Sequence, residues 1–259
     1  MSVFRFKHFD VVNERSAMKV NTDGVILGAA MTVLPSDRTM LDIGTGTGTI
    51  ALMAAQRLLG CTPNDNIGTR DETSVILNKV NDPVIEAIDI DEASASEAAS
   101  NFRKSHWSSF MNAYHCPLQE FSTSSRISYD LIFSNPPYFE DSLTAPDERK
   151  STARHTSDGL SYRDIFDFAK DRLTGKGRVS LVLPADQEAA LTRYARMCGL
   201  HLFRILRIRT VPRKAPSRIV AEFSRERCPE PQEELLTIQD EGKYTQEYLS
   251  LTRDFYLFA

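Results

Sequence analysis

The run Leu41-Asp42-Ile43-Gly44-Thr45-Gly46-Thr47-Gly48 decides the fold class. It starts inside a short apolar segment, 39–43, that is typical of a buried strand, and it leads into 49–59, an Ala- and Leu-rich segment typical of a helix. Alternate glycines between a strand and a helix permit a tight turn and let a ligand approach the backbone. The start of the helix adds free N–H groups and a positive dipole. The run therefore predicts a ligand-binding turn of an α/β protein.

The spacing of these glycines indicates the kind of ligand. A dinucleotide fingerprint reads GxGxxG, whereas here the third glycine, Gly48, comes one residue early, and Asp42 stands two residues before the first. An acid followed by alternate glycines suits a ligand with an amino group and a carboxylate, such as the amino acid end of S-adenosylmethionine. We expect Asp42, Gly44, Thr45 and Gly46 to bind that end; a glycine-rich turn without a ligand is the alternative.

Strand-like and helix-like segments alternate along the chain, which favours a mostly parallel sheet with helices on both faces. The expected strands are 39–43, 83–90, 113–116, 129–134, 178–183, 202–209 and 218–223. The expected helices are 25–31, 49–59, 92–104, 162–173 and 186–197, with the glycine-rich run 174–177 ending the fourth. No helix separates the last two strands, so at least one of them should be antiparallel. The fold class is therefore α/β and Rossmann-like, with a mostly parallel seven-stranded sheet.

Composition and cysteine usage exclude several classes of protein. Hydrophobic residues make up 41% of the chain, as in ordinary globular proteins, and no apolar run approaches the roughly 18 residues of a membrane helix. The four cysteines, Cys61, Cys116, Cys198 and Cys228, form no CxxC pair, which argues against a zinc ribbon and a disulfide scaffold. We expect a cytoplasmic protein without a signal peptide, a metal or a membrane partner, with mostly buried, reduced thiols.

The charge is unevenly distributed. Segment 201–227 carries eight Arg and Lys residues against two acids, whereas 228–247 is acidic. A basic stripe on an acidic body suits a local contact with a polyanion. A solvated strand face whose counter-charges lie on the following segment explains the pattern equally well.

Side chains after the next strands provide further candidate ligands. Asp89, at the end of the second strand of the sheet, is expected to accept hydrogen bonds from both ribose hydroxyls of a nucleoside. Ile90 would pack on the adenine, and Leu118 and Gln119 would reach the adenine edge. Asp91 fits either the ribose or the N-cap of the helix that follows it.

The run Ser134-Asn135-Pro136-Pro137-Tyr138 ends another apolar strand. The two prolines stiffen the turn, so that the Asn135 side-chain oxygen and the Pro136 carbonyl can face one external donor. An exocyclic amine with two N–H groups fits that pair, and two accepted hydrogen bonds would stabilise positive charge developing on its nitrogen. Tyr138 offers a surface on which a planar base can stack. A simple Pro-Pro strand terminator is the alternative.

These three motifs, in this order, resemble a class I S-adenosylmethionine-dependent methyltransferase of the amino-group (NPPY) type. Such enzymes methylate adenine N6 in DNA or RNA, guanine N2, or a release-factor glutamine. Further segments resemble the bacterial tRNA1(Val) (adenine(37)-N6)-methyltransferase family: they are 4–9, 18–29, Ala153-Arg154-His155, 160–163 and the Arg- and Pro-rich strand pair. The polar, turn-rich segment 61–82 reads as a surface insertion and departs from that family's compact connection.

The family resemblance implies a domain organisation and further site residues. Residues 1–38 would form a flap over substrate or cofactor, and 39–259 the methyltransferase domain. Apart from the resemblance, we expect a monomer. Thr22 would lie near the cofactor, although with Asp23 it also suits a helix N-cap. Phe9 and Lys7 would cover the base, or belong to an N-terminal strand with a core-facing edge. The expected contacts to tRNA are Arg154, His155, Arg207, Arg209 and Arg213. For Arg154 and His155, which lie on the loop after the NPPY motif, surface salt bridges are the alternative.

Other readings differ in substrate or in class. The same amino-methyl transfer on rRNA, DNA adenine or a release-factor glutamine keeps the chemistry. An NAD-binding oxidoreductase fits the glycine spacing poorly. A non-catalytic RNA-binding protein has no reason to keep Asn135 to Tyr138 intact.

Overall fold

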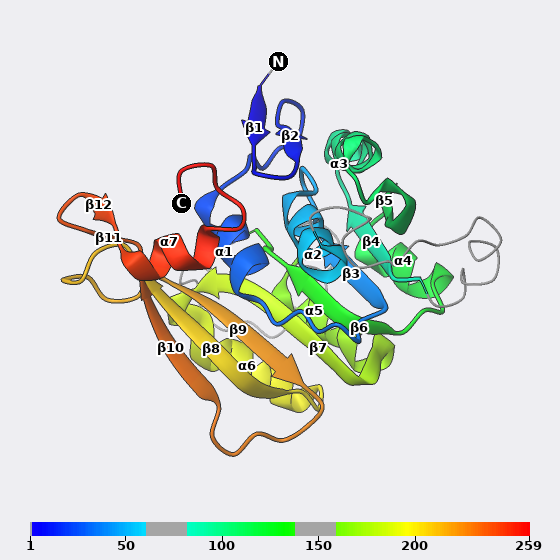
Figure 1. The fold of residues 1–259 in the computed structure, drawn as a ribbon. Helices are drawn as coiled ribbons and strands as arrows, with labels where there is room; N and C mark the ends of the chain where they lie inside the picture. Colours follow the sequence, from blue (N-terminus) through cyan, green and yellow to red (C-terminus); the bar gives the residue numbers. More distant parts are fainter. Residues whose placement is uncertain (1, 61–81, 138–158) are drawn as a thin grey trace.

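The computed structural model describes residues 2–60, 82–137 and 159–259. Eight strands form its central sheet (Figure 1). Their order across the sheet is β10 (Gln232–Thr237), β8 (His201–Arg209), β9 (Arg218–Ser224), β7 (Leu173–Pro184), β6 (Tyr129–Ser134), β3 (Thr39–Ile43), β4 (Val84–Asp89) and β5 (Met111–His115). Strand β9 is antiparallel to both of its neighbours, and the other pairs are parallel. The α/β fold class and the expected antiparallel strand are confirmed.

Helices cover both faces of this sheet. One face carries α1 (Thr22–Ala30), α2 (Thr49–Leu59), α3 (Glu92–Lys104) and α7 (Gln246–Thr252), and the other carries α4 (Leu118–Ser124), α5 (Tyr162–Arg172) and α6 (Glu188–Met197). Strand β3 shows why two cores form: Met40 is buried in the first, and Leu41 and Ile43 in the second. Alternate side chains of a strand point to opposite faces, so a strand buried on both sides needs apolar residues throughout.

Three details differ from the expectations. The sheet has an eighth strand, β10, within the acidic segment. Residues 174–177 belong to β7, where a Cβ on Gly177 would lie 2.7 Å from the Tyr129 carbonyl oxygen, so glycine is needed for close strand approach. Helix α1 begins at Thr22, and its N-cap is Asn21, whose side chain accepts the Gly24 N–H at 2.8 Å.

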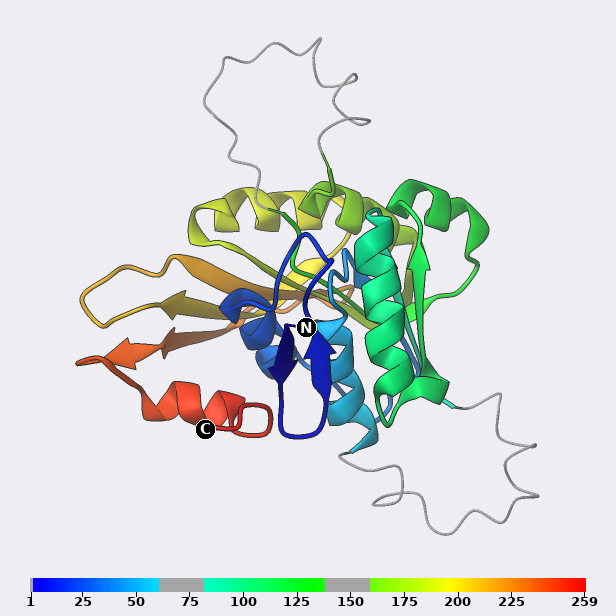
Figure 2. The same ribbon diagram turned by 90° about the horizontal axis from the view of Figure 1, so that it is seen from above.

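The N-terminal segment packs on the body of the protein. Strands β1 (Val3–Arg5) and β2 (Asp10–Val12) form a hairpin beside α3 and the C-terminal segment (Figures 1 and 2). Phe9 is 7% exposed; it stacks on Phe6 and meets Trp107 edge-on. Because its ring is inside the core, the expectation that Phe9 covers a base is wrong, and the core-facing alternative is the observed one.

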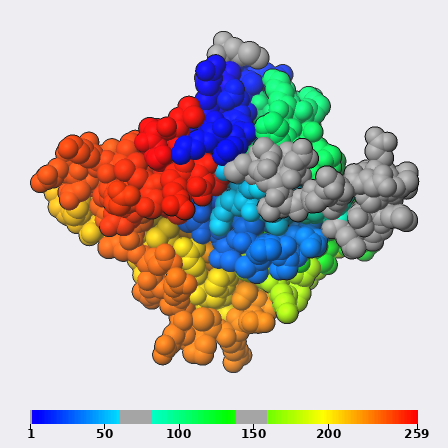
Figure 3. Space-filling model, in the orientation of Figure 1, coloured from blue at the N-terminus to red at the C-terminus, as the bar shows by residue number. Residues whose placement is uncertain are grey.

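The two chain ends lie side by side (Figure 3). The Lys7 ammonium donates to the carbonyls of Arg253 and Ala259, and the Lys7 N–H donates to Phe255 at 2.8 Å. These contacts direct Lys7 to the C-terminal turn, which corrects its expected place over the base. A short ribbon, β11 (Gln239–Asp240) with β12 (Lys243–Tyr244), leads into α7.

Two further features bear on the class of protein. No helix in the described ranges has the length and apolar character needed to span a membrane. Cys116, Cys198 and Cys228 are free thiols of intermediate burial, which agrees with the expected mostly buried, reduced thiols. Cys61 lies outside the described residues.

Candidate active site

The carboxyl ends of β3, β4 and β6 meet at one edge of the sheet. Strand β3 pairs with β4 on one side and with β6 on the other, in parallel register. The chain leaves β3 toward β4 and β5 and later returns to β6, so the direction of strand addition switches at β3. Open α/β sheets bind their ligands at such a switch point.

The glycine turn after β3 depends on left-handed backbone. Gly44, Gly46 and Gly48 have φ angles of 72°, 56° and 81°. The N–H groups of Gly44 and Thr45 both donate to the Ile88 carbonyl, at 2.9 and 3.0 Å. These two N–H groups are therefore already bonded within the protein. At Gly44 and Thr45 the turn lets a ligand approach the backbone closely but offers it no free N–H donor. A Cβ on Gly48 would lie 2.5 Å from the Phe102 ring, so this glycine also lets α3 pack against the turn.

Asp42 lies beneath this turn and is fully buried. Its Oδ2 accepts the Thr45 hydroxyl at 2.7 Å, whereas Oδ1 has no hydrogen-bond partner among the described residues. Burial, opposed by the Thr45 hydrogen bond and reinforced by the charge of Asp89, raises the pKa of Asp42 to about 7. A buried, unsatisfied carboxylate oxygen is costly, and an ammonium group would satisfy it. The site therefore fits the amino acid end of S-adenosylmethionine.

Asp89 ends β4 and faces the same turn. Its Oδ2 accepts the Gly46 N–H at 2.8 Å, and its Oδ1 accepts the Asp91 N–H at 2.9 Å. Burial is the main cause that raises the pKa of Asp89 above its ordinary value. Asp91 caps α3 by accepting the Ser94 N–H at 2.9 Å, so the N-cap alternative for Asp91 is the observed one.

The expected adenine contacts lie on neighbouring elements. Ile90 follows β4 with 66% of its surface exposed, an unusual exposure for an isoleucine at the end of a buried strand. Leu118 and Gln119 form the first turn of α4; Leu118 is buried in the core on that face, and Gln119 is exposed. Ile90 and Gln119 are therefore open to a ligand, whereas Leu118 contributes mainly to the core.

Asn135 and Pro136 follow β6 and are both buried. The strand end is held to β3 by the Ser134 hydroxyl, which donates to the Ile43 carbonyl at 2.6 Å. Asn135 is 7% exposed, and its amide nitrogen contacts the sulfur of Met18 at 3.7 Å. Tyr138, Arg154 and His155 lie outside the described residues.

The structure brings Met18 and Ser16 to this edge as well, and their role is not expected from the sequence. A Cβ on Gly46 would lie 3.4 Å from the Ser16 hydroxyl and 3.6 Å from the Met18 carbonyl oxygen. Segment 18–29 stands out in the sequence, but nothing local in it shows that Met18 reaches Asn135, 117 residues away.

Two arginines of the basic stripe each bond two glutamates within the protein. Arg204 bonds Glu222 and Glu234, at 2.8 and 2.7 Å. Arg207 bonds Glu188 and Glu233, at 2.7 and 2.8 Å, and these hydrogen bonds raise its pKa further. Arg207 is thus neutralised by glutamates of the protein, as the alternative reading of the basic stripe expected. This corrects its expected role as a free phosphate contact.

The two remaining arginines of that prediction differ from each other. Arg209 is half-buried and donates to the Thr237 hydroxyl and the Pro212 carbonyl, at 2.8 and 2.9 Å. Arg213 is exposed on the connection between β8 and β9. Of the three, Arg213 is the one whose position fits an incoming phosphate.

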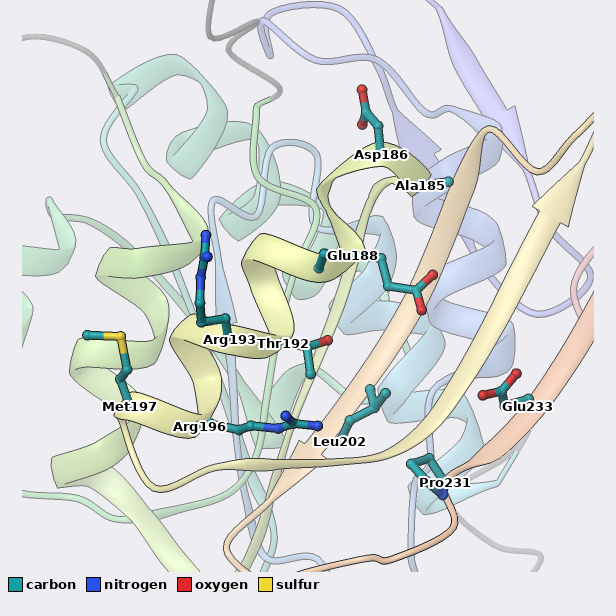
Figure 4. A pocket seen from close by; sticks show the side chains of 11 residues that line it. Ala185, Asp186, Glu188, Thr192, Arg193, Arg196, Met197, Leu202, Pro231 and Glu233 are labelled. Atoms are coloured by element: carbon teal, nitrogen blue, oxygen red, sulfur yellow. The ribbon is translucent and has the colours of Figure 1, made fainter. Parts of the chain in front are cut away.

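A surface groove lies apart from this site, between α6 and the edge of the sheet (Figure 4). It encloses about 1010 Å³, and its walls carry Arg193, Arg196 and Met197 on one side and Glu233 on the other. None of its lining residues belongs to the glycine turn, to Asp89 or to the Asn135 turn. Within the described part of the chain, no group of three His, Cys, Asp or Glu side chains could hold a metal ion.

Solved structures share the fold of this chain. A predicted O-methyltransferase from Agrobacterium tumefaciens matches with a TM-score of 0.58 and 13% identity, covering 90% of this chain and 96% of that one. A methyltransferase from Pyrococcus furiosus matches with a TM-score of 0.54 and 16% identity, covering 84% and 89%. At such identities the likeness concerns the fold, which is that of a class I methyltransferase.

Sequence relatives define the family. The family model described as an RMKL-like methyltransferase domain matches residues 29–198. Proteins named tRNA1(Val) (adenine(37)-N6)-methyltransferase are 37% identical in Parabacteroides distasonis and 38% identical in Bacteroides fragilis; both alignments cover 98% of this chain and 97% of the relative. The chain belongs to this family of S-adenosylmethionine-dependent methyltransferases, which confirms the resemblance seen in the sequence.

Proposed function

We propose that this chain methylates the exocyclic N6 amino group of an adenine in tRNA, and that the adenine is position 37 of tRNA1(Val), as the names of its relatives state. Asn135 and Pro136, both buried at the end of β6 beside the glycine turn of β3, carry this proposal, because together they would supply two acceptors to one amine. The alignment to those relatives over 98% of the chain supports the choice of RNA.

S-adenosylmethionine supplies an electrophilic methyl group when it is bound. Asp42 would hold its ammonium group through Oδ1, the oxygen that lacks a partner among the described residues. Asp89 would accept its ribose hydroxyls, with Ile90 and Gln119 beside the adenine and Leu118 behind them. Gly44, Thr45 and Gly46 form the turn that the ligand approaches closely. Thr22, exposed in the first turn of α1, is a further proposed contact to the cofactor.

The acceptor pair would act on the substrate amine. The Asn135 oxygen and the Pro136 carbonyl would each accept one N–H of the amine, which directs the nitrogen lone pair toward the methyl group. As the N–C bond forms, positive charge develops on nitrogen, and two pre-oriented acceptors stabilise it. The nitrogen then loses a proton late, so no strong base is required. Tyr138 would stack on the base.

An adenine stacked inside an RNA loop has to leave the stack to reach this site, at a cost of a few kcal/mol. Contacts between basic side chains and phosphates would offset that cost and make binding sensitive to salt. Arg213, Arg154 and His155 are the proposed contacts. A tRNA substrate also suits the cytoplasmic location that we propose.

Product mapping tests this proposal. The protein would be incubated with labelled S-adenosylmethionine and, in parallel, unmodified tRNA, rRNA, duplex DNA and release factor, and the products digested for mass spectrometry. We expect N6-methyladenosine at position 37 of tRNA1(Val), and its loss in Asn135→Ala at unchanged thermal stability. Label in another substrate would retain the amine chemistry and overturn the choice of RNA; absence of label with all four would overturn the proposed reaction.

A further inference from the structure

One face of α3 carries polar side chains that bind the segment between β2 and α1. Ser94, Glu97 and Asn101 lie three and four residues apart, hence on one side of the helix. Together they bind the end of β2 and the stretch that follows it up to α1, residues 13–21, which we call the strap.

Glu97 is the strongest of these anchors. It is 1% exposed, and its two oxygens accept the N–H groups of Glu14, Arg15 and Ser16, at 2.9, 2.9 and 3.0 Å. Burial opposes the charged carboxylate, yet the three N–H donors keep its pKa below the ordinary value. A buried carboxylate that accepts three consecutive N–H groups fixes the path of that backbone.

Asn101 and Ser94 bind the chain on either side of the residues that Glu97 holds. The Asn101 amide exchanges hydrogen bonds with Val12, at 2.9 and 3.0 Å, and also donates to the Thr47 carbonyl of the glycine turn at 2.9 Å. The Ser94 hydroxyl donates to the Ser16 hydroxyl at 3.1 Å. The strap and the glycine turn are therefore held in one frame by α3.

Beyond Ser16 the strap crosses the active edge. The Ser16 hydroxyl donates to the Met18 carbonyl at 3.0 Å, and both atoms lie close to where a Cβ on Gly46 would be. Met18 then places its sulfur 3.7 Å from the amide nitrogen of Asn135. The strap ends at Asn21, the N-cap of α1.

We propose that Met18 is a positioning residue for methyl transfer: its sulfur engages the Asn135 amide nitrogen and so presents the Asn135 amide oxygen to the substrate amine. This inference rests on the role of Asn135 in the proposed function. Glu97 supports Met18 indirectly, by holding the strap.

The chemistry of the two side chains explains why this contact matters. An asparagine amide has a donor end and an acceptor end of nearly the same shape, and a thioether can only accept. A sulfur at one end therefore favours the orientation with NH₂ toward it. The reversed amide would turn two N–H donors toward the N–H groups of the amine, which is repulsive. A leucine in place of Met18 has a similar volume but no acceptor.

Kinetics separate this role from simple packing. We expect Met18→Leu to lower kcat about fivefold, the value of one modest hydrogen bond, with KM for S-adenosylmethionine and the melting temperature unchanged. Met18→Gln restores an acceptor oxygen, and its NH₂ can turn to solvent because position 18 is 40% exposed, so this variant should recover kcat to within about twofold. Met197→Leu, on the groove of Figure 4, is the matched control and should leave the kinetics unaltered.

Side-chain NMR of the free protein gives a readout that is independent of methyl transfer. The Asn135 amide signals, assigned by their loss in Asn135→Asp, should exchange with water several-fold faster in Met18→Leu than in wild type or Met18→Gln. If wild-type protein methylates no tRNA, the proposed function fails, while this exchange measurement still decides the contact. The positioning role would be overturned if Met18→Leu kept the kcat and the amide exchange rate of the wild type. It would also be overturned if kcat fell as far in Met18→Gln as in Met18→Leu.

Discussion

The Asp89 carboxylate accepts the Gly46 N–H across 2.8 Å, which ties the end of β4 to the glycine turn of β3. A second backbone donor, the Asp91 N–H, holds the other oxygen at 2.9 Å. Each carboxylate oxygen has lone pairs for a further donor. The candidate ribose acceptor is thus oriented by the same turn that lies over Asp42, so the two ends of the ligand site share one rigid frame.

The first prediction concerns Asp89→Ala. The ribose hydroxyls would lose two hydrogen bonds to the Asp89 carboxylate, each worth about 1.5–3 kcal/mol. The dissociation constant of S-adenosylmethionine should therefore rise by roughly 100-fold or more. Isothermal titration calorimetry measures it directly.

Asp91→Ala is the matched control for that change. Asp91 caps α3, and loss of the cap should cost about 1 kcal/mol of stability with little effect on affinity. Equal losses of affinity in both variants would place the ribose elsewhere.

The second prediction compares Gly48→Ala with Gly199→Ala. Both glycines have positive φ angles, 81° and 75°, and an alanine there costs about 1–2 kcal/mol. Only Gly48 adds a collision, because its Cβ would lie 2.5 Å from the Phe102 ring, whereas a Cβ on Gly199 would have no neighbouring atom of the described residues within 4 Å. Overpacking typically costs about 1–3 kcal/mol more. Urea unfolding should therefore show a larger loss for Gly48→Ala; equal losses would mean that α3 moves aside freely.

The third prediction concerns pH. The pKa of Asp42 in the folded protein is raised to about 7, so the folded state holds a proton that the unfolded state releases near its ordinary value of about 3.9. This contribution to stability is present at low pH and is lost as pH rises through 7. The free energy of unfolding of Asp42→Asn minus that of wild type should increase by up to about 1.4 kcal/mol per pH unit between these values.

Ligand binding gives the complementary test of Asp42. An ammonium group favours the ionised carboxylate, so S-adenosylmethionine should bind wild type more tightly as pH rises toward 7. Asp42→Asn should bind weakly at every pH, without that rise. A flat affinity profile in wild type would show that the ammonium group does not meet this carboxylate.

The sequence was most informative where the signals are local. The bounds of β3, α2, α3 and β6 were predicted to the residue, because glycines, prolines and the Asp91 cap mark their ends. The left-handed glycines and the acid before them likewise indicated the cofactor turn. The two prolines after β6 likewise predicted the acceptor pair of Asn135 and Pro136, and the family resemblance then narrowed the substrate.

Features that depend on distant partners were not predictable in this way. Strand β10 is polar, and it forms because it pairs with β8, where Arg204 and Arg207 meet its glutamates. The strap depends on Glu97, more than 80 residues away along the chain. Phe9 looked like a base contact only because nothing local shows the ring cluster that buries it.

The last prediction follows from that pairing of charges. Arg213 is exposed, and Arg213→Glu should weaken tRNA binding, reduce the slope of log affinity against log salt by about one, and leave stability unaltered. Arg207 already bonds Glu188 and Glu233, so Arg207→Ala should chiefly lower stability, by about 1 kcal/mol for this half-exposed pair. Filter binding over a range of salt concentrations, beside urea unfolding, separates the two effects. Were Arg207→Ala to change the salt slope as much as Arg213→Glu, the glutamates would have to release Arg207 when RNA binds, because a fully paired guanidinium displaces few phosphate counterions.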